Sequence, residues 1–300
     1  MKYPFRFYLE YAGYLAIETA INWMPGWLVR PVAKGFAVLG FSILRIRRKV
    51  MLQNLAIAFP EKSERERRRI AFRSYEHFSW LILEFMRMHR LTPEQLARRI
   101  DFPQEAEFVE QFVKPEKGLV LVSGHFGNWE WVIAYLAHLW TRKVAVIQKR
   151  QKNRLVDLRM AGLRQRWGME IIYMRGAIRN ALRALSENAL VGLLGDQDIG
   201  DRGVYVPFFG WNASTPPGAA VLHVKSGAPL VFLTGVRLPD NRVKIEIQLI
   251  SETPPALPTE EAVRELTARY TEELERYIRR YPEQYFWMHK RWKNARPLST

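Results

Sequence analysis

The 300-residue sequence contains no cysteine, which excludes disulfide frameworks, thiol nucleophiles and cysteine-ligated zinc. Acidic residues are also scarce relative to basic ones: 30 Asp and Glu stand against 46 Lys and Arg, and the net charge is +16. A charge of this size implies an anionic partner, and nucleic acid, anionic lipid, a phosphorylated substrate and an acidic carrier protein all qualify. The basic excess is concentrated in the first third of the chain.

The chain also lacks a long uncharged hydrophobic run near its N-terminus. Residues 3–24 are rich in aromatic and aliphatic side chains, but Glu10, Glu18 and Asn22 interrupt them. A membrane-spanning helix needs about 20 apolar residues with few charges, so we do not expect this segment to span a membrane. A cationic segment followed by an A-x-A cleavage site is missing, and we therefore expect no cleaved signal peptide.

A second apolar stretch, over residues 32–46, runs directly into the basic cluster 47–49. Apolar helices that are rich in aromatic residues and end in a basic cluster are typical of an interfacial anchor on an anionic membrane. A buried helical hairpin around residues 25–26 is the alternative. We interpret residues 1–50 as membrane-associating helices and residues 51–300 as one further domain.

The pattern of apolar residues predicts the secondary structure of this domain. Ser63 and Glu66 have the spacing of a capping box, which opens a predicted helix. From residue 118 onward, short β-type runs alternate with helical patterns. The predicted strands are 119–122, 144–147, 170–173, 190–194, 230–234 and 243–249. The predicted helices are 129–140, 154–167, 177–188, 216–226 and 259–280. This alternation predicts an α/β fold with a mostly parallel central sheet flanked by helices and preceded by a helical extension.

The first predicted strand leads into a turn that contains His125. Functional side chains collect at the carboxyl ends of strands in such sheets, so we expect chemistry here. Asn128 is suited to cap the next helix, and the carboxylate of Glu130 in its first turn can fold back to His125. A histidine oriented by a carboxylate is a general base, because one ring nitrogen stays protonated while the other accepts a proton. A merely hydrogen-bonded turn histidine is the alternative.

Two kinds of catalytic nucleophile are missing. The sequence has no G-x-S-x-G motif and no thiol. A covalent acyl-enzyme is therefore not indicated, and direct attack by an activated substrate hydroxyl fits better.

Four sequence blocks resemble one enzyme family. His125-x4-Glu130 within S-G-H-F-G-N-W-E is similar to the HX4(D/E) signature of glycerolipid-type acyltransferases, in the version of the late lipid A biosynthesis acyltransferases (lauroyl and myristoyl transferases) and the related phosphatidylinositol mannoside acyltransferases. The other blocks are the basic segment 149–168, the D-x-D segment 195–200 with V-P-F-F-G at 206–210, and P-E-Q-Y-F-W-M-H-K-R-W-K at 282–293. Lys149 stands where the family pattern has an arginine.

The resemblance implies a glycerolipid-acyltransferase-like sheet and the transfer of a fatty acyl chain from acyl carrier protein or coenzyme A to a hydroxyl of a membrane lipid or glycolipid. It implies His125 as the base and Glu130 as its orienting partner. Lys149, Arg150 and Arg164 would neutralise the phosphates of the acceptor or stabilise the thioester oxyanion. Residues 143–166 contain eight basic residues and one acidic residue, which supports such a role. A solvated basic helix face is the alternative.

Asp196 and Asp198 admit several interpretations. We interpret them as part of a substrate-ordering loop, because V-P-F-F-G after them is suited to lining an acyl groove or contacting lipid. A glycosyltransferase D-x-D site that holds Mg²⁺ and a plain Asp-capped turn are the alternatives. The six histidines show no metal-type spacing, so we expect no metal-binding residues and no cofactor.

The C-terminal segment 285–293 alternates aromatic and cationic side chains. Such a pattern suits a membrane interface, with rings at the headgroup level, or a single-stranded nucleic acid. We favour the membrane interface. The predicted protein is an acyltransferase at the cytoplasmic face of the inner membrane, bound peripherally or by a single N-terminal anchor, with an anionic membrane surface and no nucleic acid as partners. A phosphatidylinositol mannoside-type acyltransferase, a D-x-D lipid glycosyltransferase and a basic nucleic-acid-binding protein are the alternatives.

Overall fold

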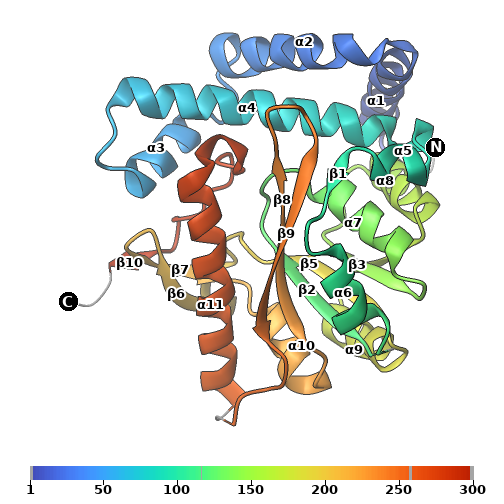
Figure 1. Ribbon diagram of the computed structural model, residues 1–300. Helices are drawn as coiled ribbons and strands as arrows, with labels where there is room; N and C mark the ends of the chain where they lie inside the picture. Colours follow the sequence, from blue (N-terminus) through green and yellow to red (C-terminus); the bar gives the residue numbers. More distant parts are fainter. Residues whose placement is uncertain (1–2, 116, 257–258, 298–300) are drawn as a thin grey trace.

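The computed structural model describes residues 3–115, 117–256 and 259–297 (Figure 1). Its centre is a seven-stranded sheet in the order β1-β9-β8-β2-β5-β3-β4. Strand β9 pairs antiparallel with β8, and the other neighbouring pairs in this sheet are parallel. The predicted α/β class with a mostly parallel sheet is therefore confirmed.

Short strands and connecting helices alternate through this part of the chain. The strands are β1 (Ile100–Asp101), β2 (Leu119–Ser123), β3 (Val144–Gln148), β4 (Met169–Tyr173), β5 (Leu190–Leu194), β8 (Leu230–Arg237) and β9 (Val243–Ser251). The helices are α5 (Pro93–Ala97), α6 (Glu105–Phe108), η3 (Val109–Val113), α7 (Trp129–Leu139), α8 (Arg154–Arg166), α9 (Ala177–Ser186), α10 (Gly218–Ser226), α11 (Thr259–Arg280) and η5 (Pro282–Gln284). The strands and helices predicted after residue 118 are all present, with small shifts at their ends.

The central sheet separates two hydrophobic cores. All five residues of β2 are buried, as expected of a strand covered on both faces. Val120 and Val122 face the core that α10 and α11 cover, whereas Leu119 and Leu121 face the core that α7 covers. The continuous apolar run in the sequence follows from this double burial, because side chains alternate between the two faces of a strand.

A second, three-stranded antiparallel sheet was not expected from the sequence. It consists of β6 (Val204–Phe208), β7 (Trp211–Thr215) and β10 (Arg296–Pro297), and η4 (Gly200–Arg202) precedes it. Phe208 and Phe209 are 0% and 4% exposed and pack against Trp287 and Trp292. These buried rings contradict the expectation that V-P-F-F-G contacts lipid at the surface, whereas its lining of an acyl groove stays a prediction.

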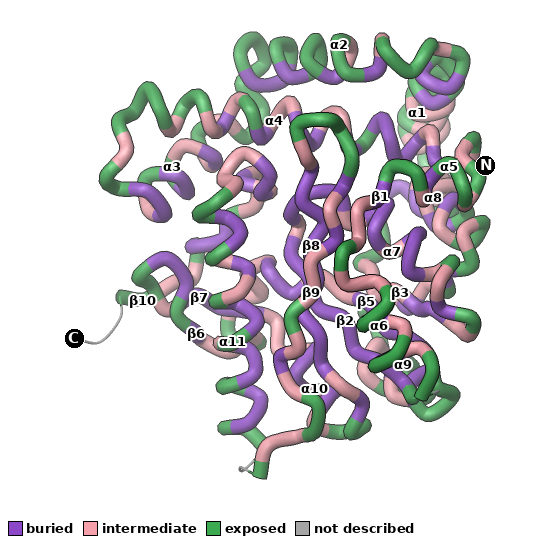
Figure 2. Tube along the Cα trace, in the orientation of Figure 1, coloured by how far each residue is buried: buried purple, intermediate pink, exposed green. Residues whose placement is uncertain are grey.

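The N-terminal helices form a layer beyond the sheet. They are α1 (Phe5–Trp23), α2 (Gly26–Ala37), η1 (Val38–Ile43), α3 (Arg48–Ala58), α4 (Glu64–Arg87) and η2 (Met88–Arg90). The predicted capping box of Ser63 and Glu66 opens α4. Helix α4 crosses one end of the sheet, and α2 lies along its outer side, buried toward α4 and exposed away from it (Figures 1 and 2).

The carboxylates that interrupt the first apolar segment hold α1 against α8. Glu18 accepts from the Arg159 guanidinium at 2.9 Å, and Glu10 accepts from the Asn153 amide at 2.8 Å. Among the described residues, no single helix has the length and apolar character needed to cross a membrane. One bent pair, Gly26–Ile43 with Arg48–Ala58, meets those requirements of length and composition with an 89° bend between its helices.

Candidate active site

The candidate site lies at the carboxyl edge of the sheet, between β2 and β5. These strands are parallel neighbours, and their last residues, Ser123 and Leu194, are paired in register. The next backbone N–H after β5, that of Gly195, donates to the Ser123 carbonyl at 2.8 Å. The two loops that follow the strands therefore run side by side and bring His125 and Asp196 together.

Asp196 holds His125 through both of its carboxylate oxygens. Its Oδ1 lies 2.7 Å from the ring Nδ1, and its Oδ2 accepts from the His125 backbone N–H at 3.0 Å. Burial raises the pKa of Asp196, but the charge and the hydrogen bonds of His125 outweigh burial and leave this pKa below its ordinary value. An ionised carboxylate only accepts hydrogen bonds, so Nδ1 carries a proton, and in the neutral ring Nε2 is the nitrogen with the lone pair. The side-chain nitrogen of Gln197 lies 3.4 Å from this Nε2.

This geometry corrects the assignment of Glu130 as the carboxylate that orients His125. Glu130 is buried in the first turn of α7, where it accepts from Arg164 Nε at 3.0 Å and from the Trp129 indole at 3.1 Å. The Trp129 and His125 rings meet edge to face at 5.2 Å. Glu130 therefore acts on His125 only through Trp129. The sequence did hold a signal for Asp196, because Asp196 follows its strand as closely as His125 follows β2.

The resemblance implies that Arg164 binds substrate, but in the structure its guanidinium interacts with groups of the protein. Besides Glu130, its guanidinium donates to Gln148 Oε1 at 2.5 Å and lies 5.0 Å from the Phe85 ring centroid. Burial lowers the pKa of Arg164, but the charge and hydrogen bonds of Glu130 outweigh burial and raise it overall. Arg164 thus neutralises Glu130, and its direct contact with substrate stays a prediction.

Glu130→Gln is expected to destabilise the protein by about 1–3 kcal/mol, because Arg164 loses its buried counter-charge. We expect kcat to fall less than it would on loss of the base, because this variant weakens only the hydrogen bond that holds the Trp129 indole. Urea unfolding and kcat measure the two effects, and Arg164→Gln alone and the double variant are the controls. We expect the double variant to lose less free energy of unfolding than the sum of the losses in the two single variants. Lost turnover at unchanged stability would mean that Glu130 acts directly in the chemistry.

The turn around His125 depends on Gly127. The φ angle of Gly127 is +59°, and a Cβ at this position would lie 1.8 Å from the Gly235 carbonyl oxygen. No other residue fits such a close approach of two backbones. Asn128 caps α7, as predicted, by accepting from the Trp131 backbone N–H at 3.1 Å. Its amide nitrogen also donates to Glu84 of α4 at 2.9 Å, which ties the turn to the helical layer.

Helix α4 supports this turn with a buried histidine. His77 Nε2 donates to the Gly127 carbonyl at 3.0 Å. Burial, and then the nearby charge of Arg237, lowers the pKa of His77 to about 3, so the ring is neutral. Arg237 itself forms a buried ion pair with Glu84. The backbone that carries His125 is therefore held from behind by groups that exclude water.

The buried His77 predicts a pH dependence of stability. Its pKa is about 3 in the folded protein and about 6.5 in an unfolded chain, so the unfolded state binds the proton more readily between these values. The contribution of neutral His77 is fully present above about pH 6.5 and is lost as the pH falls toward 3, by several kcal/mol in total. We expect His77→Gln to flatten the acid limb of a stability-against-pH curve. His138→Gln, at an exposed position of α7, should leave that limb unchanged. Equal slopes for the two variants would contradict this prediction.

The C-terminal segment 285–293 packs partly behind the site, which corrects the expectation that its aromatic rings lie at a membrane interface, whereas membrane contact by the exposed Lys290 and Lys293 stays a prediction. Tyr285 and Arg291 are 2% and 1% exposed. The Tyr285 hydroxyl forms hydrogen bonds with Asp196 and Arg291, and burial raises the Tyr285 pKa well above its ordinary value. Arg291 also donates to the Ser214 carbonyl at 2.5 Å. Tyr285 of this segment thus also holds Asp196 in place, a role that the sequence reasoning missed.

A second histidine, His289, lies among the charges of the site. Its Nδ1 is buried and has no hydrogen-bond partner in the part of the chain that the structure describes. Burial lowers the pKa of His289, and the charges of Asp196, Arg291 and His125 also act on it. The His289 carbonyl is fixed by the Asn54 amide at 2.6 Å. The sequence signal for His289 was its position in the H-K-R-W part of the fourth sequence block.

Asp198 has a different role from Asp196. Its carboxylate accepts from the Gly200 backbone N–H at 3.0 Å and from the Asn294 side chain at 2.7 Å, so it closes a turn and fastens the C-terminal segment. The Asp-capped turn, one of the alternatives considered above, describes Asp198. Within residues 3–115, 117–256 and 259–297, no group of three or more His, Asp or Glu side chains is arranged to hold a metal ion.

Lys149 and Arg150 follow β3 and are exposed at the same carboxyl edge of the sheet. They line an open hollow of about 480 Å³ together with Glu10 and Asn153. The Arg150 guanidinium lies 4.3 Å from the Tyr173 ring centroid. Substrate binding by Lys149 and Arg150 stays a prediction. Other cations of this basic run are paired within the protein, including Arg154, Arg159 and Arg164.

Comparison with known proteins extends the resemblance over the whole chain. The model of the family described as bacterial lipid A biosynthesis acyltransferase matches residues 4–294. The lipid A biosynthesis lauroyltransferase of Escherichia coli K12 is 26% identical over 296 residues, which cover 96% of this chain and 92% of that protein. The lipid A biosynthesis palmitoleoyltransferase of the same strain is 26% identical over 264 residues, 85% of this chain and 81% of that protein.

A third relative, matched over a shorter stretch, is named for a different acceptor. The phosphatidylinositol mannoside acyltransferase of Mycobacterium tuberculosis H37Rv is 28% identical over 167 residues, which cover 53% of this chain and 51% of that protein. The family match, by contrast, spans nearly the full sequence and includes all four sequence blocks. The chain therefore belongs to the bacterial lipid A biosynthesis acyltransferase family.

Proposed function

We propose that the chain moves a fatty acyl chain from an acyl thioester, carried by acyl carrier protein or coenzyme A, to a hydroxyl of a glycolipid such as a lipid A precursor. The observation that carries this proposal is the pairing of His125 Nδ1 with Asp196 at 2.7 Å, in a chain of this family. The pairing leaves Nε2 open toward the side chain of Gln197. A base so oriented suits the activation of a hydroxyl.

In the proposed reaction, His125 Nε2 takes the proton of the acceptor hydroxyl while that oxygen bonds to the thioester carbonyl carbon. The tetrahedral intermediate then collapses, the electrons of the C–S bond pass to sulfur, and the imidazolium returns its proton to the thiolate. Asp196 stabilises the imidazolium that forms between these steps. The Gln197 amide, 3.4 Å from Nε2, is available as a donor to the oxyanion. The acceptor is the nucleophile, so no acyl-enzyme forms.

Exposed apolar side chains of residues 1–50 support membrane association. Trp23 and Trp27 are 83% and 75% exposed where α1 meets α2, and Ile43 and Leu44 are 64% and 58% exposed at the end of η1. Exposed aromatic and aliphatic residues beside a basic cluster suit the boundary of an anionic leaflet. We propose that this segment lies on the cytoplasmic face of the inner membrane, peripherally or as a single N-terminal anchor, and that residues 51–300 carry the catalysis.

The acceptor phosphates are assigned to Lys149 and Arg150 in this proposal. Both side chains are exposed in the hollow beyond β3, and neither forms an ion pair with a described carboxylate. A phosphorylated sugar lipid that approaches the carboxyl edge of the sheet meets these cations. Arg164 is paired with Glu130, so it is not among the cations assigned to the phosphates.

The two other classes of function have less support. Asp196 and Asp198 accept hydrogen bonds from different parts of the chain, which does not favour a shared Mg²⁺ between them. In the C-terminal segment 285–293, Tyr285, Trp287 and Trp292 are buried, so these rings are not free to stack on the bases of a nucleic acid. The phosphatidylinositol mannoside acyltransferase that matches about half of this chain supports phosphatidylinositol mannoside as an alternative acceptor.

The test is acyl transfer by the full-length protein, with fatty acyl carrier protein and fatty acyl coenzyme A as donors. Lipid A precursor and phosphatidylinositol mannoside are the acceptors, and mass spectrometry identifies the products. We expect one acceptor to gain one acyl ester, with a rate that EDTA does not change. Sugar transfer that EDTA abolishes would favour the glycosyltransferase. Salt-sensitive nucleic-acid binding with no acyl product would favour the third class.

A further inference from the structure

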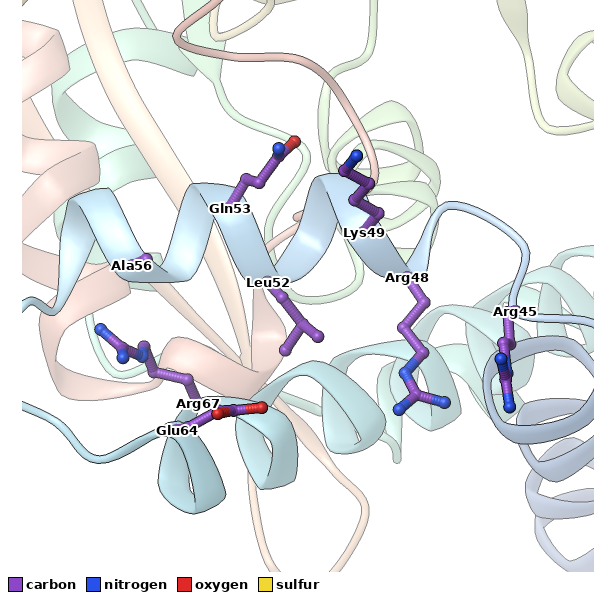
Figure 3. Close-up of a pocket in the computed structure, with 8 residues that line it drawn as sticks. All are labelled: Arg45, Arg48, Lys49, Leu52, Gln53, Ala56, Glu64 and Arg67. Atoms are coloured by element: carbon purple, nitrogen blue, oxygen red, sulfur yellow. The ribbon is translucent and has the colours of Figure 1, made fainter.

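A basic hollow along α3, between that helix and the start of α4, has no part in the chemistry at His125. It is lined by Arg45, Arg48, Lys49 and Arg67, with Glu64 as its one carboxylate, and has a volume of about 560 Å³. Figure 3 shows Arg48 and Leu52 on the side of α3 that faces α4, with Glu64 and Arg67 on the first turns of α4, whereas Lys49 and Gln53 point to the other side of α3. We propose that this hollow binds the phosphate headgroup of an anionic phospholipid. The inference deepens the membrane association in the proposed function and rests on it.

The cations of the hollow are not neutralised by the protein. In the part of the chain that the structure describes, Arg45, Arg48, Lys49 and Arg67 form no ion pair with a carboxylate. Desolvation, and then the charges of Arg68 and Arg45, lowers the pKa of Arg48. Four cations gathered beside the single carboxylate of Glu64 repel one another, and a bound phosphate would relieve this repulsion.

The backbone holds these cations in place at some cost. Arg45 and Arg47 have φ angles of 54° and 58°, in the left-handed region that glycine or asparagine adopts more readily. These two residues turn the chain through the 89° bend between the segments Gly26–Ile43 and Arg48–Ala58. Helix α3 also begins without a side-chain cap, so the N–H groups of its first turn add positive potential to the hollow.

The surroundings of the hollow favour a lipid over a soluble anion. Ile43, Leu44 and Ile46 are 64%, 58% and 50% exposed immediately before the basic cluster. An apolar edge beside a phosphate site matches a phospholipid, whose headgroup is covalently attached to acyl chains. Free phosphate would leave this apolar edge in water. An acidic carrier protein would complement the charge but not the edge.

The test compares vesicle binding of two double variants that lose the same charge. Arg48→Gln/Arg67→Gln removes two of the four cations that line the hollow. Arg175→Gln/Arg179→Gln instead alters exposed arginines at α9, which lies far from α3 in the molecule (Figure 1). Full-length proteins are sedimented with vesicles of phosphatidylcholine, with or without phosphatidylglycerol. We expect the hollow variant to bind the anionic vesicles about 10–30-fold more weakly than wild type, and the control variant within about twofold. Thermal unfolding checks that both variants fold.

Three outcomes would overturn the inference. The first is equal vesicle binding by the two double variants. The second is a selective loss of binding to acyl carrier protein, with vesicle binding unchanged. The third is that inorganic phosphate stabilises the wild-type protein but not the hollow variant, while the hollow variant binds vesicles as the wild type does. The His125→Ala protein should bind vesicles as wild type does, so failure of acyl transfer and failure of headgroup binding are distinguishable.

Discussion

His125→Ala is expected to lower kcat about 10²- to 10⁴-fold, because it removes the proposed base. His125 Nε2 is the only ring nitrogen of this residue that Asp196 leaves open, and the side chain is 23% exposed. Truncation therefore removes little packing, and we expect the fold to persist. Steady-state acyl transfer measures kcat and KM, and KM should change much less than kcat because the base acts in the transition state.

The matched control for this variant is His138→Ala. His138 lies on the exposed side of α7, so its loss should leave kcat unchanged. Circular dichroism and thermal unfolding establish that both proteins fold. Turnover by His125→Ala at the wild-type rate would remove the proposed mechanism, whatever the acceptor.

The local elements of the fold were predictable from the sequence, but one hairpin was not. Strand β2 is an uninterrupted apolar run, and the capping box of Ser63 and Glu66 marks the start of α4. The β6–β7 hairpin turns through Phe209 and Gly210, with φ angles of 50° and 74°. Such a turn usually carries asparagine or aspartate before glycine. A buried phenylalanine at this position hides the turn from sequence reasoning, because core packing decides the choice of residue.

The partner of His125 could not be read from local spacing. Asp196 is 71 residues away along the chain, and it reaches His125 because β2 and β5 are neighbours in the sheet. That neighbourhood depends on the order of strands, which the alternation of strands and helices does not determine. Glu130 is near in sequence, but its place in α7 directs it to Arg164. Sequence proximity therefore favoured the wrong carboxylate.

The amino-acid composition gives the number of charged residues but not which of them are paired or buried in the fold. Glu18 reads as an interruption of an apolar segment, yet it pairs with Arg159 and fastens α1 to α8. Arg291 reads as a membrane-facing cation, yet it is buried behind Asp196. A buried ion or hydrogen-bonded arginine needs partners from distant segments, and only the tertiary structure supplies them. The exposed basic residues that the proposals assign to anionic groups are those of the N-terminal helices and of the edge beyond β3.

Asp196→Asn is expected to lower kcat about 10³- to 10⁴-fold, with KM changed far less. Asparagine fills the same space, but its amide can donate to Nδ1 of His125. The ring then carries its proton on Nε2 and has no lone pair for the acceptor hydroxyl. The variant also loses the negative charge that stabilises the imidazolium. Steady-state acyl transfer over the same donor and acceptor pair measures the effect.

Asp198→Asn is the matched control, because it makes the same chemical change two residues away. Asp198 accepts hydrogen bonds from Gly200 and Asn294 and forms none with His125 within the described residues. We expect it to lose about 1–2 kcal/mol of stability through the weakened turn, while kcat falls far less than in Asp196→Asn. Urea unfolding separates the two effects. Equal losses of kcat in both variants would mean that the D-x-D loop acts as a whole, and the assignment of Asp196 as the residue that sets the tautomer of His125 would be wrong.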